Sequence, residues 1–226
     1  MTLESIKSKI AALLAKAEST NNAFEAEAFM AKVNELLEKH QIEMHEIRGA
    51  QGDKDPVGAA DGETNIYVSI GWARNVASSL ARYYGCRTIW FKIGNHLRYE
   101  VMGRESARQT FELMLPFIIS QVKQQAKRLR ADNASITESV WQREVGQALW
   151  VRIHNMIPKA EERRAELSAN ALIPVDEVDA FFDARHPTAT KGKPKPVRFT
   201  EAARDAASKI SLHVQATGTG RTKLLK

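Results

Sequence analysis

The chain has 226 residues, of which 43% are apolar and 27% are charged, a balance that is typical of globular proteins and argues against a disordered chain. No apolar run approaches the roughly 20 residues that a membrane-spanning helix needs, and the N-terminus lacks the apolar core of a signal peptide, so we expect a cytoplasmic protein. The single cysteine, Cys86, excludes an intramolecular disulfide and a CxxC zinc site, and we expect it to be a small core residue.

The net charge of +6 is unevenly distributed along the chain. Residues 1–64 sum to −5, residues 65–134 sum to +7, and residues 169–226 sum to +4, whereas residues 135–168 are neutral. If the protein meets a polyanion, we therefore expect its middle and C-terminal parts to make the contact.

Two amphipathic helices are predicted at the N-terminus. Apolar residues recur at spacings of three and four over residues 3–18, and a second such stripe, which includes Phe29, covers residues 23–42. Because only four polar residues separate the two helices, they must pack antiparallel. Residues 1–47 are therefore predicted to form a helical hairpin module.

A linker and a second domain are predicted to follow the hairpin. Residues 48–64 contain four glycines and one proline with almost no apolar mass, a composition that predicts a linker. Residues 65–216 are predicted to form an α+β domain, and residues 217–226 a basic tail. Within the domain, residues 66–70 have the composition of a strand, and residues 71–84 have the pattern of a helix.

The clearest strand pattern flanks Gly94-Asn95. Residues 87–93 are rich in branched and aromatic side chains, and residues 96–103 alternate between apolar and polar or charged side chains. Two such runs joined by a two-residue turn predict a β-hairpin. The alternation further predicts that one face of this hairpin is half-solvated.

The rest of the domain has a helical pattern. Residues 104–130 form a long helix that Pro116 should kink or divide in two, and a second long helix begins near residue 135. A short acidic helix is expected within residues 173–187, and a last helix within residues 200–212. The predicted fold class is α+β and mostly helical, with an N-terminal antiparallel helical hairpin followed by a domain with a small antiparallel sheet and long helices.

Two acidic clusters raise the possibility of a metal site. Residues 38–46 include His40 and His45, but their spacing of five places them on different faces of a helix, and we favour a structural role for His40. The second cluster has acidic residues at helical spacing and consists of Asp176, Glu177, Asp179, Asp183 and His186. A magnesium site is one interpretation, and the solvated face of a helix is the one that we favour.

A set of basic and aromatic residues gives the strongest indication of function. Cations and aromatic rings lie close together on the predicted hairpin, and further cations crowd the C-terminal end of the following helix. The predicted nucleic-acid-binding residues are Arg87, Trp90, Lys92, Arg98, Lys123, Lys127 and Arg130. Cationic side chains neutralise phosphates, and aromatic rings stack on bases. An ordinary solvated basic face stays open as an alternative, because cations near a helix C-terminus also compensate the helix dipole.

The segment IKSKIAALLAKAESTNNAFEAEAFMAKVNELLEKHQI, residues 6–42, closely resembles the N-terminal module of an uncharacterised family called domain of unknown function 2786. The stretches LLAKAEST, EAEAFMAK and LLEKHQI carry this resemblance together. Later stretches, among them LARYYGCRTIWF and VMGRESARQTFELM, resemble the domain that often follows this module in bacterial and phage proteins. The resemblance implies a phage or mobile-element setting and supplies no established catalytic residues.

These observations favour a non-enzymatic, nucleic-acid-associated accessory protein of a phage or other mobile element, without a cofactor and with DNA or RNA as its partner. The alternative is a protein-interaction or inhibitory factor that targets a host complex and uses its charge for docking. A metal-dependent hydrolase is the third hypothesis, because the acidic and histidine residues stay in two local clusters without a recognised metal-binding spacing.

Overall fold

The computed structural model describes residues 3–20, 25, 28–29, 32–33, 35–36, 55–62, 71–93, 96–170, 177–189, 197–210 and 212. The chain divides into two compact units. The first unit consists of residues 1–40 and 211–226, and the second unit consists of residues 41–210. The predicted boundaries at residues 47, 64 and 216 concern independent folding and stay a prediction. The predicted basic tail, residues 217–226, lies outside the described residues.

The first unit contains helix α1 (Leu3–Ser19), which confirms the first predicted helix. Ile10 and Ala17 are buried, and their spacing of seven residues, two helical turns, places them on one face. Lys16 is exposed, as expected for a residue of the opposite, polar side. Ile10 of the apolar stripe therefore lies on the buried side of α1.

The second predicted helix, residues 23–42, lies mostly outside the described residues. At its described positions the backbone is helical, and Val33 is fully buried. Phe29, which we expected on the buried side, is partly exposed, and Lys16 Nζ lies 5.9 Å from the centroid of its ring. A cation beside the ring face is a favourable contact at an exposed site.

Helix α3 (Gly71–Tyr83) opens the helical part of the second unit and confirms the helix predicted there. Trp72, Val76 and Leu80 recur every four residues and are all buried. The chain then turns at Gly85, whose φ of +83° lies in the left-handed region that favours glycine.

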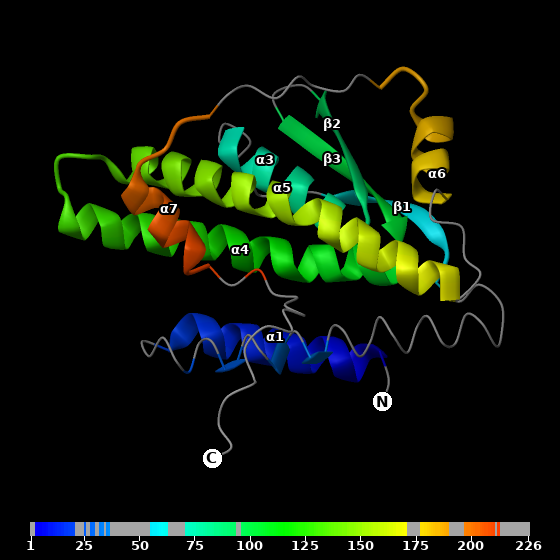
Figure 1. Cartoon of the computed structure of the whole chain (residues 1–226), viewed down its shortest axis with the longest axis horizontal. Coiled ribbons are helices and arrows are strands. Elements are labelled where there is room, and N and C mark those ends of the chain that lie inside the picture. The colour runs from blue at the N-terminus through cyan, green and yellow to red at the C-terminus, as the bar shows by residue number, and fades with distance from the viewer. Residues whose placement is uncertain are drawn as a thin grey trace, which may run out of the picture. The chain divides into compact units, whose positions relative to one another are not determined.

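Two long helices pack against each other and against α3 (Figure 1). They are α4 (Glu105–Asp132) and α5 (Glu138–Asn170). Pro116 lies inside α4 and does not divide it, so of the two predicted outcomes division was wrong and a kink stays a prediction. Pro116 and Glu112, whose carbonyl loses its usual donor, are both exposed residues, and water can satisfy that carbonyl.

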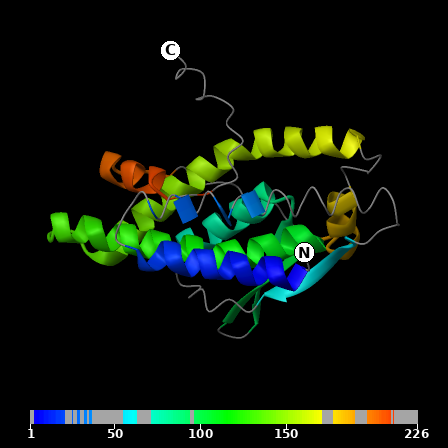
Figure 2. The same cartoon turned by 90° about the horizontal axis from the view of Figure 1, so that it is seen from below.

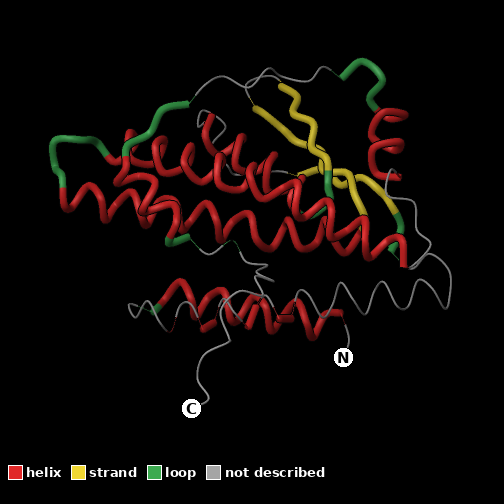
Figure 3. The backbone as a smooth tube through the Cα atoms, viewed as in Figure 1, coloured by secondary structure: helices red, strands yellow, loops and turns green. Residues whose placement is uncertain are grey.

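Three strands form one small antiparallel sheet (Figure 3). The strands are β1 (Val57–Gly62), β2 (Arg87–Ile93) and β3 (His96–Arg104), in the order β1-β3-β2. The predicted hairpin is therefore confirmed as β2 and β3, and the mostly helical α+β fold class is confirmed with it.

Strand β1 corrects the expectation that residues 48–64 are only a linker. Residues 57–62 pair with β3 from Val57 opposite Arg104 to Gly62 opposite Tyr99. An edge strand is held by backbone hydrogen bonds along one side, so a glycine- and alanine-rich segment can join a sheet without large apolar side chains. The strand predicted at residues 66–70 lies outside the described residues.

The two faces of the sheet are covered by different helices. Trp90 and Tyr99 lie on the face that packs against α3 and α4. The opposite face carries Glu100 and Met102, which are only 4% and 0% exposed. The same face also carries exposed Arg98 and partly exposed Phe91, so it is solvated at its outer end and covered at Glu100 and Met102. Helix α6 (Glu177–Arg185), the predicted short acidic helix, contacts all three strands and covers this face.

Helix α7 (Glu201–Ser208) confirms the last predicted helix and packs against α4 and α5. Figures 1 and 2 both place α6 and α7 at opposite ends of the second unit. Helix α7 thus lies at one end of the second unit, and the sheet and α6 lie at the other end.

Candidate nucleic-acid interface

The structure divides the predicted nucleic-acid-binding residues among the two faces of the sheet and the surface of α4. Arg87 and Trp90 are three positions apart on β2, and an odd spacing places two strand residues on opposite faces. Their separation could have been predicted from that spacing alone. The cations and the aromatic rings of the hairpin therefore do not form one surface.

Trp90 is partly buried and contacts α3. Its Nε1 donates a hydrogen bond of 2.9 Å to Ser78 Oγ of α3, and its ring lies 5.2 Å from that of Tyr99. Tyr99 is buried and meets the ring of Phe111 edge-on at 6.0 Å, and burial raises the pKa of its hydroxyl to about 12. These rings pack against helices and are not placed as platforms for stacked bases.

Arg87 lies on the opposite face and is occupied by a carboxylate of α6. Its Nε and Nη2 donate to Asp179 Oδ1 and Oδ2 at 2.5 and 2.6 Å. The hydrogen bond to Asp179 raises the pKa of Arg87, so the guanidinium stays charged. This two-pronged geometry is the one with which arginine also binds phosphate.

The cations of the hairpin's outer end are Lys92 and Arg98. Lys92 lies in β2 opposite Leu97, and its side chain is outside the described residues. Arg98 lies in β3 opposite Phe91 and is exposed. Of the predicted strand cations, Arg98 is therefore the one that the structure shows at the surface.

The C-terminal half of α4 carries cations and no acidic residue from position 113 to position 131. Lys123, Lys127 and Arg130 recur at spacings of four and three and are all exposed. Arg130 Nη1 lies 4.0 Å from Glu138 Oε2, so part of its charge is compensated. Within the described part of the chain, Lys123 and Lys127 form no ion pair.

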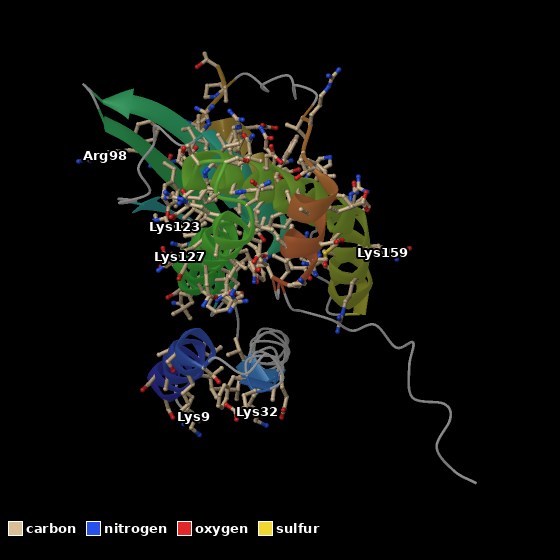
Figure 4. The ribbon with its side chains drawn as sticks, turned by 90° about the vertical axis from the view of Figure 1, so that its left-hand side faces the viewer. Lys9, Lys32, Arg98, Lys123, Lys127 and Lys159 are labelled. Atoms are coloured by element: carbon tan, nitrogen blue, oxygen red, sulfur yellow. The ribbon has the colours of Figure 1, made fainter. Side chains whose placement is uncertain are left out.

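Figure 4 shows how the exposed cations are grouped. Arg98, Lys123 and Lys127 lie on one side of the second unit, although they come from β3 and α4, whereas Lys159 of α5 lies on the other side. We call Arg98, Lys123 and Lys127 the cationic face. It retains three of the seven predicted residues, which lie on the same side of the second unit.

Two acidic residues of the second cluster form ion pairs with the sheet, although Asp179 and Asp183 are exposed, as expected for a solvated helix face. Glu177 binds Arg104, Asp179 binds Arg87, and His186 Nε2 lies 2.6 Å from Glu100 Oε2. Asp176 and both histidines of the first cluster lie outside the described residues. The residues that the structure describes include no group of three or more metal-ligating side chains.

Sequence analysis missed the sheet partners of this acidic helix. Arg104 and Glu100 belong to β3, more than 70 residues away in sequence from the groups that they bind. The only local signal was an excess of acid on one short helix and of arginine on the hairpin. That signal does not show which charges meet.

Cys86 is confirmed as a buried core residue with 1% exposure. Burial raises the pKa of its thiol to about 12, only partly offset by Arg108 and Arg164. Since the thiolate is the reactive form, this cysteine is not a nucleophile at neutral pH.

Residues 5–44 match the family described as Protein of unknown function (DUF2786). This segment belongs to that family. The DUF2786 match confirms the resemblance of the N-terminal segment and does not extend to the later domain, so every residue of the cationic face lies outside it. No curated protein and no solved structure matches the chain. None of the described helices is both long and apolar enough to cross a membrane.

Proposed function

We propose that the protein binds nucleic acid without chemical catalysis, through contacts between phosphates and the cationic face, as an accessory protein of a phage or other mobile element. The observation that carries this proposal is the stretch of α4 from residue 113 to residue 131. It has no acidic residue, and in it the exposed Lys123 and Lys127 share a face and lie on the same side as Arg98. Ammonium and guanidinium groups on one surface neutralise adjacent phosphates and release their counterions.

The position of the aromatic rings makes the proposal more specific. Because Trp90 and Tyr99 pack against α3 and α4, the cationic face offers charge without these stacking platforms. Binding should therefore depend on phosphates and not on base identity. A preference for single strands that arises from stacking on these rings is not expected.

The test is a salt series with a labelled duplex and the purified full-length chain. For duplex DNA, each phosphate contact contributes about 0.9 to the slope of log K against log salt. The variant Lys123→Ser/Lys127→Ser should bind more weakly and lose about two contacts' share of that slope. Because both side chains are exposed, its unfolding free energy should stay within about 0.5 kcal/mol of the parent.

The matched control is Arg143→Ser/Lys159→Ser, which removes the same charge from exposed positions of α5. If both double variants lose equal affinity and equal slope, binding reflects overall charge and the assigned face is wrong. If the parent chain binds no nucleic acid at low salt, the proposal fails. Recovery of one stoichiometric protein partner would then favour the docking alternative.

A further inference from the structure

Helix α6 is attached to the sheet by four polar contacts. In two of them an acidic residue of α6 binds an arginine of the sheet, and in the other two a basic residue at the end of α6 contacts a glutamate of the sheet. Its acidic residues reach the sheet's arginines, with Glu177 on Arg104 and Asp179 on Arg87. In the reverse direction, Arg185 Nε donates to Glu100 Oε1 at 2.6 Å, and His186, the residue that follows the helix, contacts the other oxygen of Glu100.

Apolar contacts supply part of this attachment, and charged contacts supply the rest. None of the nine residues of α6 is buried, and its three acidic residues and one arginine give it a formal charge of −2. Val178, Phe181 and Phe182 are neither fully buried nor exposed, so they contribute apolar contacts. The charged contacts are the part of the attachment that another anion can replace.

The two arginines beneath α6 have the chemistry of a phosphate site. A guanidinium binds a carboxylate and a phosphate with the same fork of N–H donors. Arg104 and Arg98 are six positions apart on β3, an even spacing that places them on the same face of the strand. The covered arginines are thus connected along β3 to an exposed member of the cationic face.

We propose that α6 is an acidic lid that occupies Arg87 and Arg104 in place of phosphates and is displaced when nucleic acid binds. This inference rests on the proposed function and adds a second, covered contact surface to it. The contacts of Glu100 with Arg185 and His186 oppose release, so the lid stays closed without a ligand. A bound phosphate backbone compensates by taking over the two arginines.

The first test removes the lid's acidic contacts and leaves the sheet unchanged. Glu177→Gln/Asp179→Asn should bind a labelled duplex more tightly than the parent chain, and its salt slope should increase by about 0.9 for each arginine that meets a phosphate. Adding Arg87→Ser should abolish part of this gain. Near-ultraviolet circular dichroism identical to that of the parent shows that the variant is folded.

The matched control is Asp183→Asn/Glu162→Gln, which removes the same charge from two exposed positions that form none of these ion pairs. If the lid variant and this control have the same affinity and slope, the lid proposal is wrong. If they do so while the parent chain binds a duplex and depends on Lys123 and Lys127, the lid proposal alone fails and the proposed function stands. If neither the parent nor the lid variant binds a duplex, both proposals fail.

The second test needs no substitution. Amide hydrogen exchange of residues 177–185 should become faster when a saturating duplex is added, because displacement exposes the backbone of α6. Exchange in α7 should not increase, since its attachment involves no residue of the sheet. If the exchange of α6 is unchanged or slower at saturation, the lid is not displaced and the inference is overturned.

Discussion

Helices α6 and α7 have similar lengths and are attached to the second unit by different forces. α7 buries Ala203, Ala206 and Ala207, and Ile210 just beyond it is fully buried. α6 buries none of its residues fully and combines partly covered apolar side chains with ion pairs to the sheet. Burial of apolar surface is insensitive to moderate salt, whereas ion pairs are screened by it, and exposed pairs more than partly buried ones. The attachment of α6 should therefore depend on salt more than that of α7.

The ends of α7 reinforce this difference. Thr200 accepts a hydrogen bond from Ala203 N at the start of the helix. At its end, Arg152 Nη1 donates to the carbonyl groups of Ala207 and Ile210 at 2.8 and 2.6 Å. Both ends of α7 thus have partners for backbone groups that a helix leaves unpaired.

The largest expected effect comes from the apolar anchor of α7. Ile210→Ala should lower the unfolding free energy by about 2–5 kcal/mol, because it leaves a cavity at a fully buried site. Urea unfolding measures this loss. Lys209→Ala, at the exposed neighbouring position, should change it by less than about 0.5 kcal/mol. Equal effects of the two substitutions would show that α7 is not anchored by burial.

A smaller loss of unfolding free energy is expected when the carbonyl groups at the end of α7 lose their hydrogen-bond donor. Arg152→Ala removes the partner of two carbonyl groups and should cost about 1–3 kcal/mol in urea unfolding. Arg143→Ala removes an exposed arginine of α5, the helix that also carries Arg152, and serves as the control. A loss no larger than that of the control would mean that water replaces Arg152 at no cost.

The ion pairs of α6 should contribute still less to stability. Asp179→Asn should cost at most about 1 kcal/mol, since the two side chains of its pair are 53% and 29% exposed. The difference from the parent chain should vanish in about 1 M salt, where the screening length is about 3 Å. Asp183→Asn is the control on the same helix. A cost that persists at high salt would indicate that Asp179 acts through packing.

No effect at all is expected at Cys86. This thiol is buried near Arg108 of α4 and Arg164 of α5, so Asp179→Asn should leave its alkylation rate at neutral pH unchanged. The measurement separates release of α6 from unfolding of the sheet. Faster alkylation in the variant would show that the sheet loosens with α6 and would contradict an exchangeable attachment.

The helices and the hairpin were predictable because their signals are local. Apolar spacing along α1, α3 and α4 and the alternation around Gly94-Asn95 depend on residues within one element. The edge strand β1 was missed, because its composition carries no strand signal and its pairing with β3 is made through the backbone. Sequence analysis missed that α6 covers Glu100, because the alternation of apolar and polar residues along β3 is the same whether water or a charged helix lies on that face.

The candidate site was predictable to a similar extent. Lys123 and Lys127 share a face because helical spacing is fixed, and the structure keeps both exposed. Arg87 could not be recognised as occupied, because its partner Asp179 is 92 residues away in sequence. Trp90 was predicted to bind nucleic acid together with Arg87, although their odd spacing on β2 already places the two side chains on opposite faces of the sheet.

The contrast between the two short helices is tested most directly by amide hydrogen exchange of the unmodified protein in a salt series without ligand. If α6 is held by charge, its exchange should become faster as sodium chloride rises from about 0.1 to 1 M, because screening weakens its ion pairs. Exchange in α7 should stay constant over the same range. Equal responses of α6 and α7, or an α6 whose protection is unchanged in high salt, would contradict this account.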